Sequence, residues 1–295
     1  APVTLQLLSG STSLSQATEP GQTQAPFLPL PSLMPETTEV VAAGPGSRVA
    51  GDLLAGRTAP ELAQRRWSLA PGSATQLLLL PIPVAGLDPL LNGRNLQLRF
   101  HSSGPVAMAT LAAHGEDGQA PSEEQWLQLL KDQRMSSKEH QPTPRSSKGK
   151  IIYSRVSGVQ LGSSWRARIT DPGSTVLAAP KAPLSWPISS LERGTLATQQ
   201  VQTAELKGFY PGTAWAAHGN YGVEYDLTLP LKNTGTATVT LQLSLDSPLK
   251  GNSTTSLLRF RDDLNGPVMF RGPVQTTGLE DSEGVSKGRQ TQHLV

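Results

Sequence analysis

The stretch ATVTLQLSLDS at residues 237–247 shares five consecutive letters, VTLQL, with APVTLQLLSGS at residues 1–11. In both copies apolar residues alternate with polar ones, which is the pattern of a β-strand buried on one face. The second copy follows the strand-like run YGVEYDLTLPL and the turn sequence KNTGT, so the sequence predicts a hairpin in which residues 221–231 pair with residues 238–245. The inward face of the returning strand should contain Val239, Leu241, Leu243 and Leu245.

The first copy should be a strand of the same kind, with Val3, Leu5 and Leu7 facing a core. By analogy with the second copy, we expect it to be a returning strand whose outgoing partner lies before residue 1. One backbone edge of this strand would then be unpaired. An internal duplication and a coincidence between two alternating strands both account for the shared letters.

The same alternation recurs along the chain, and 28 glycines and 25 prolines supply many turns. In the segment SSWRARIT, for example, Trp165 and Ile169 share one face with Ala167, and arginines take the other. We therefore predict an all-β fold of two antiparallel β-sandwich (Ig-like) domains with one or two short helices. By its place in the alternation Trp165 should lie in a core, and we expect Trp186 to pack as well.

Helix is predicted at two places only. The stretch SEEQWLQLLKDQ begins with a capping box of Ser122 and Gln125, and its apolar residues follow a helical spacing, so a helix should cover residues 122–133. A shorter helix is expected near residues 47–56, where it would end at Gly56.

A polar segment divides the chain. Residues 135–150, MSSKEHQPTPRSSKGK, are rich in serine, proline and lysine and lack an apolar period. We predict a first sandwich domain over 1–134, a flexible linker or long loop over 135–149 and a second sandwich domain over 150–295. Both domains are expected to lack strands, at the N-terminus of the first and the C-terminus of the second. A second polar stretch at 276–290 should be an exposed hairpin loop.

The overall composition excludes several classes of protein. Lys plus Arg number 25 against 23 for Asp plus Glu, and a net charge of +2 argues against a nucleic-acid partner. The chain has no cysteine, which excludes disulfides and thiol catalysis. No apolar run reaches the roughly 18 residues of a membrane-spanning helix, so no transmembrane segment is expected in this chain.

The sequence contains no recognisable catalytic or metal-binding motif. Five histidines are scattered without the spacing of a zinc site, and neither a nucleophile elbow nor a phosphate-binding loop is present. We therefore predict no catalytic residues, no metal and no cofactor. Carboxylates that could pair for glycoside hydrolysis are Glu224 with Asp226, and Asp262 with Asp263. Their more ordinary interpretation is the solvated face of a sheet.

The strongest candidate for a binding site is the loop FYPGTAWAAHGNYG at residues 209–222, which concentrates aromatic and amide groups. Rings that stack and polar groups that orient are typical of a sugar or peptide site. The same residues also suit a structured loop that covers the end of a sandwich. The candidate ligand-binding residues are Tyr210, Trp215, His218, Asn220 and Tyr221.

Several phrases in the sequence resemble an uncharacterised, mainly cyanobacterial family of secreted proteins that contain a domain of unknown function. The phrases, in chain order, are GPGSRVAGDLLAGR (44–57), LPIPV (80–84), LNGR (91–94), SSGPV (102–106), RVSGVQLGSSW (155–165), ERGTLATQ (192–199), AHGNYGVEYDLTLPLKN (217–233) and FRGPV (270–274). The resemblance implies an exported protein and brings no catalytic residues. Typical members are longer at both ends, which implies that this chain is truncated.

These observations favour a non-enzymatic exported protein with a structural or interaction role in the cell envelope or on the cell surface. It would lie outside the cytoplasm, in the periplasm, on the outer membrane surface or secreted, with envelope proteins or polysaccharide as partners. One alternative is a carbohydrate-binding module that uses the loop 209–222. The other is a glycoside hydrolase-like enzyme with an unrecognised carboxylate pair.

Overall fold

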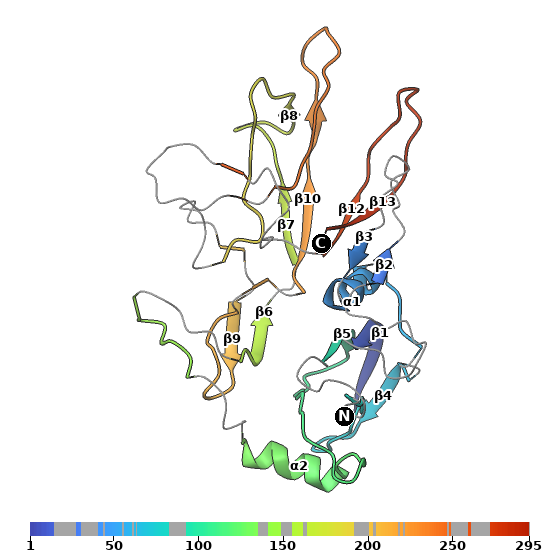
Figure 1. The fold of residues 1–295 in the computed structure, drawn as a ribbon, viewed down its shortest axis with the longest axis vertical. Coiled ribbons are helices and arrows are strands. Elements are labelled where there is room, and N and C mark those ends of the chain that lie inside the picture. Colours follow the sequence, from blue (N-terminus) through green and yellow to red (C-terminus); the bar gives the residue numbers. More distant parts are fainter. Residues whose placement is uncertain are drawn as a thin grey trace. The chain divides into compact units, whose positions relative to one another are not determined.

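The computed structural model of the protein forms two compact units (Figure 1). Unit 1 contains residues 1–134 and 247–295, and unit 2 contains residues 135–246. The predicted linker thus falls within unit 2, and residues 247–295 group with unit 1; the predicted division into domains over 1–134 and 150–295 stays a prediction. The residues that the structure describes are 1–14, 28–30, 41–43, 45–54, 56–60, 62, 64–82, 93–134, 141–148, 155–161, 164–191, 201–202, 205–217, 219–220, 222–246, 248, 259–260 and 272–294.

The described elements are mostly strands, which confirms the all-β class; the two sandwich domains stay a prediction. In unit 1 they are β1 (Val3–Leu14), β2 (Leu28–Leu30), β3 (Val41–Ala43), α1 (Pro45–Leu54), β4 (Arg66–Leu69), β5 (Arg94–Ser102), α2 (Glu123–Asp132), β12 (Gly272–Thr276) and β13 (Gln290–Leu294). In unit 2 they are β6 (Gly158–Leu161), β7 (Ser164–Arg168), β8 (Leu177–Ala178), β9 (Glu205–Phe209), β10 (Glu224–Thr228) and β11 (Leu231–Lys232).

Strand β1, which contains the first VTLQL, is the centre of an antiparallel sheet with the order β4-β1-β5. Leu5 and Leu7 are buried there with Leu62 and Trp67, so the predicted inward face is confirmed for these two leucines. The expected unpaired edge is wrong, because Leu5 pairs with Trp67 on one side and with Ser102 on the other. The sequence does not show that two later strands, rather than one preceding strand, flank β1.

The two helices lie where the sequence predicts them. Ser122 caps α2 with both bonds of a capping box: its Oγ accepts from the backbone N–H of Gln125 (3.2 Å), and its own N–H donates to Gln125 Oε1 (2.7 Å). No side chain of α2 is buried. Helix α1 contains the buried Val49. No helix of the described residues is long and apolar enough to cross a membrane.

Strand pairing in unit 2 differs from the antiparallel prediction. Strands β6 and β9 are antiparallel, but β7 pairs with β10 and β8 with β11 in parallel. Parallel neighbours need a long crossover. The chain provides one, because Trp165 pairs with Tyr225 across a connection of many residues. The alternation of polar and apolar residues correctly predicted β7 and β10 as strands, but it carried no information on their relative direction.

The second VTLQL does not form the expected hairpin strand. Its turn is present: the backbone N–H of Gly235 donates to Asn233 Oδ1 (2.9 Å), and the chain, orange in Figure 1, folds back there. Residues 238–245 then belong to no strand within the described part of the chain. The predicted inward positions Val239, Leu241, Leu243 and Leu245 are 40–71% exposed. The prediction that they line a core is therefore wrong; within the described residues β10 pairs with β7, and its other edge has no strand partner.

The C-terminal part agrees with its prediction. Strands β12 and β13 pair antiparallel from Gly272 with Leu294 to Thr276 with Gln290, and an exposed loop connects them. The polar stretch at 276–290 is thus a hairpin loop.

Candidate functional site

The aromatic loop 209–222 is fastened to the segment that precedes β6. The N–H of Tyr210 donates to the carbonyl of Ser157 (2.8 Å), and the N–H of Ala214 donates to the carbonyl of Arg155 (2.8 Å). Between them, the buried Thr213 donates its hydroxyl to the carbonyl of Tyr210 (2.6 Å). These bonds give the loop a defined backbone shape.

The indole of Trp215 is engaged by the predicted linker. Its Nε1–H donates to the carbonyl of Thr143 (2.8 Å), and the guanidinium of Arg145 lies 5.3 Å from the ring centroid. Part of the ring face is therefore occupied by a cation–π contact. Residues 141–148, predicted to be linker, thus contribute to unit 2 through these contacts.

Asn220 holds two neighbouring segments together. Its Nδ2 donates to Ser189 Oγ (3.2 Å) and to the hydroxyl of Tyr225 on β10. Among the described residues its buried Oδ1 has no hydrogen-bond partner. Of the five predicted site residues, the structure describes Tyr210, Trp215 and Asn220; His218 and Tyr221 lie outside the described residues. These three residues make contacts with different segments, and none of these contacts joins one to another.

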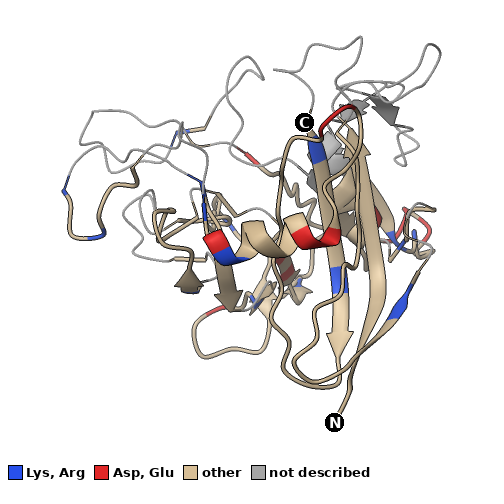
Figure 2. Cartoon of the chain, turned by 90° about the horizontal axis from the view of Figure 1, so that it is seen from below, with Lys and Arg blue, Asp and Glu red and all other residues tan. Residues whose placement is uncertain are grey.

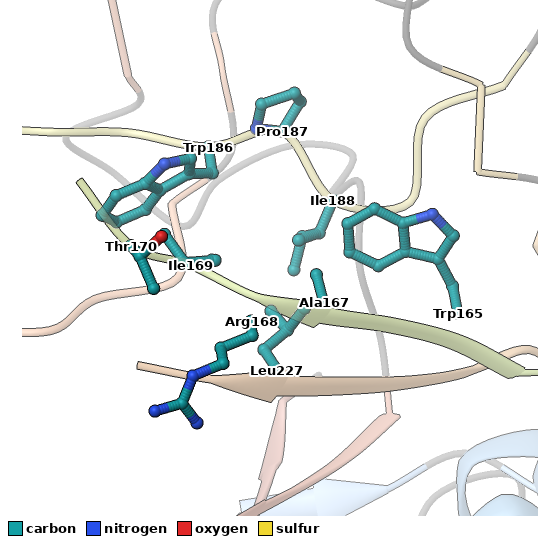
Figure 3. A pocket seen from close by; sticks show the side chains of 9 residues that line it. All are labelled: Trp165, Ala167, Arg168, Ile169, Thr170, Trp186, Pro187, Ile188 and Leu227. Carbon is teal, nitrogen blue, oxygen red and sulfur yellow. The ribbon is translucent and has the colours of Figure 1, made fainter. Parts of the chain in front are cut away.

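The structure contains a different aromatic site, a pocket of about 300 Å³ beside β7. Figure 3 shows the indoles of Trp165 and Trp186 at its two ends, with Ile188 between them. Trp186 is 41% exposed, so the expectation that it packs in a core is wrong. The residues that line the pocket are Trp165, Ala167, Arg168, Ile169, Thr170, Trp186, Pro187, Ile188 and Leu227.

The strand pattern explains one wall of this pocket. Trp165 and Ala167 alternate out of β7, and in the parallel register they stand opposite Tyr225 and Leu227 of β10. The rings of Trp165 and Tyr225 are 6.1 Å apart and tilted by 53°. Alternation predicted this apolar face, but the second wall comes from residues 186–188, which have no strand pattern. That wall could not have been found from periodicity.

Hydrogen bonds fix the second wall. Gln202, which is 2% exposed, donates its Nε2 to the carbonyl of Pro187 (2.8 Å) and accepts at Oε1 from the N–H of Ser190 (3.0 Å). Ser189 has a left-handed backbone with φ of 57°, which is costly for a residue with a side chain. The Asn220 bond to its hydroxyl adds a second fixed point. The segment is therefore anchored by hydrogen bonds at Pro187, Ser189 and Ser190.

Tyr225 contacts Trp165 of the pocket, and the pKa of its phenol is shifted. Burial raises the pKa of its phenol above the ordinary 10.0, and the hydrogen bonds with Ser189 and Asn220 act in the opposite direction. The phenol is therefore neutral at physiological pH and serves as a hydrogen-bonding group between β10 and its neighbours.

Of the carboxylates considered for glycoside hydrolysis, Glu224 and Asp226 belong to the face of β10 opposite Tyr225 and Leu227 by strand alternation. Asp226 is exposed and pairs with Arg166 of β7 at 3.6 Å, as cross-strand neighbours of opposite charge do. Asp262 and Asp263 lie outside the described residues. The described residues include no group of three or more His, Asp or Glu side chains that could hold a metal ion. Acidic and basic residues are both scattered over the described chain in Figure 2.

Comparison with known protein families gives a match over the whole chain. A family described as protein of unknown function (DUF3370) matches the chain over residues 1–295. No curated protein and no solved structure matches.

Proposed function

The chain belongs to this DUF3370 family. We propose that it is a non-enzymatic, exported interaction protein of the cell envelope or cell surface. We further propose that it associates with a second copy of itself through residues 238–245. Export rests on the resemblance of its sequence phrases to secreted proteins. The interaction role rests on one structural observation, the exposed apolar face of this segment.

Residues 238–245 have the chemistry of a strand that lacks a partner. The four apolar side chains on one face are exposed, and no charged residue occurs between Lys232 and Asp246. Exposed strand-forming segments usually contain charges or prolines that prevent pairing. The equivalent residues of β1 form ladders on both edges, which supports the ability of VTLQL to pair.

The spacing of the apolar residues favours a second copy as the partner. In an antiparallel pair of identical segments centred on Gln242, Val239 would stand opposite Leu245 and Leu241 opposite Leu243. All apolar side chains would then share one face, and no like charges would meet. Such pairing closes into a two-fold dimer rather than an open fibre.

The test is sedimentation equilibrium of the full chain and of two matched aspartate variants. Leu243→Asp places a charge on the apolar face and should abolish the dimer. Thr240→Asp places the same charge on the opposite face and should leave the dimer largely intact. Both positions are exposed, so neither change should unfold the chain.

A cross-linking experiment tests the register. Since the chain has no cysteine, Gln242→Cys introduces one thiol per copy, and in the proposed dimer the two thiols lie opposite each other. A short bis-maleimide should join these copies but not those of Thr234→Cys, at the tip of the turn. A monomer at all concentrations, or equal cross-linking of both variants, would refute the dimer. Recovery of the full-length protein in the cytoplasmic fraction would refute export.

A further inference from the structure

We propose that the pocket between Trp165 and Trp186 binds a pyranose ring of an oligosaccharide. This site is separate from the segment 238–245, and it replaces the aromatic loop 209–222 as the location of carbohydrate binding. Its support comes from the shape of the pocket, the kind of groups that line it and the rigidity of its walls.

The size and position of the aromatic rings suit a sugar. A volume of about 300 Å³ is at the lower end of ligand pockets, which suits one ring rather than an extended ligand. The two indoles at the ends of the pocket provide flat apolar surfaces for the C–H groups of a pyranose (Figure 3). The exposed side chain of Trp186 is accessible to a ligand without any rearrangement.

The polar groups suit a neutral ligand. Thr170 contributes a hydroxyl beside Trp186 (Figure 3), and a hydroxyl can both donate to and accept from a sugar hydroxyl. Arg168 belongs to the opposite face of β7 by strand alternation, and its guanidinium donates to the carbonyl of Thr175 (3.4 Å). Arg168 is the one charged residue of the lining and stays a cation, but its guanidinium points away from the two indoles (Figure 3), so the groups beside the indoles are uncharged, which favours a neutral hexose or N-acetylhexosamine.

The walls are fixed before any ligand is bound. Trp186 and Pro187 are attached to a segment that Gln202 holds from one side and Asn220 from the other. Trp165 packs against Tyr225 on the opposite wall. A site with preformed walls loses little conformational entropy on binding. Ser189, which follows the wall residues Trp186 and Pro187, has a left-handed backbone conformation. Such a conformation costs free energy and is common at binding sites.

The test is tryptophan fluorescence of the full chain titrated with cellohexaose, chitohexaose and, as a competing class of ligand, a proline-rich peptide. We expect saturable quenching by at least one of the two hexasaccharides. Trp186→Ala should weaken this binding by at least about tenfold, which corresponds to about 1.4 kcal/mol. Trp186→Phe keeps an aromatic surface and should retain most of the affinity.

The matched control is Trp126→Ala, which removes the half-buried indole of α2, a helix outside the pocket lining. This variant should bind as the unmodified chain does. The proposal is overturned if neither hexasaccharide gives saturable quenching, if the peptide alone binds, or if Trp186→Ala and Trp126→Ala behave alike. Sedimentation of the same samples reports separately on the dimer, so failure of one proposal is distinguishable from failure of the other.

Discussion

Replacing Leu5 with alanine should strongly destabilise the central sheet of unit 1. Leu5 is 1% exposed and is held between Trp67 of β4 and Ser102 of β5. Because both neighbouring strands are hydrogen bonded to β1, the backbone has little freedom to collapse into the space. A buried Leu→Ala change costs roughly 2–5 kcal/mol, and this rigid setting indicates about 3 kcal/mol or more.

The same strand provides a matched control. Leu8 is 50% exposed and lies where the pairing of β1 with β5 shifts between Leu7 and Ser9. Leu8→Ala should therefore change the stability by less than about 0.5 kcal/mol.

Amide hydrogen exchange of β1 and β5 measures both effects in the full chain. A loss of about 3 kcal/mol corresponds to roughly a hundredfold faster exchange. Equal exchange rates in Leu5→Ala and Leu8→Ala would refute the assignment of the core to this face of β1.

Three further predictions follow from local geometry. A Cβ at Gly158 would lie 2.8 Å from the Cα of Phe209 and overlap the carbonyl oxygen of Gly208, so Gly158→Ala should destabilise the β6–β9 pair by about 1–3 kcal/mol. Gly208→Ala is the control and should not destabilise the pair, because a Cβ there would meet no atom within 4 Å. Hydrogen exchange of the β9 amides distinguishes the two variants. Ser122→Ala removes the capping box and should weaken α2 by about 0.5–2 kcal/mol, measurable as faster exchange of its first turn and contradicted by unchanged rates. Because the folded pKa of Tyr225 is raised, its contribution to stability is fully present below pH 10.0 and is lost as the pH rises through the folded pKa; thermal unfolding between pH 9 and pH 11 should show a loss that Tyr225→Phe reduces, and equal pH dependence in both proteins would contradict this.

The sequence predicted elements better than it predicted partners. The capping box of Ser122 is a local signal, and the helix is present with both bonds. The alternation of β1 correctly identified Leu5 and Leu7 as core residues. Which strands flank β1 depends on contacts with residues far along the chain, and no local pattern encodes them.

The candidate site illustrates the same limit. The loop 209–222 is aromatic, and its described residues mostly hold segments together, as Trp215 does with Thr143. The pocket combines a face of β7 that alternation predicts with Trp186, which lies in a segment without periodicity. The buried Gln202 that fixes this segment could not be recognised from the sequence, because a single polar residue in a stretch without hydrophobic periodicity is ordinarily predicted to be exposed.

The central position of β1 also has a consequence for the order of folding. Leu5 of β1 pairs with Ser102 of β5. A loop of nearly a hundred residues must therefore close before the hydrogen bonds between these two strands can form. The entropy of closing such a loop opposes pairing until the whole segment is available, and contacts of this separation slow folding. During synthesis β1 therefore leaves the ribosome well before either neighbouring strand exists. Its apolar face is exposed for that interval, and a chaperone that binds extended apolar segments would find a binding site in this strand.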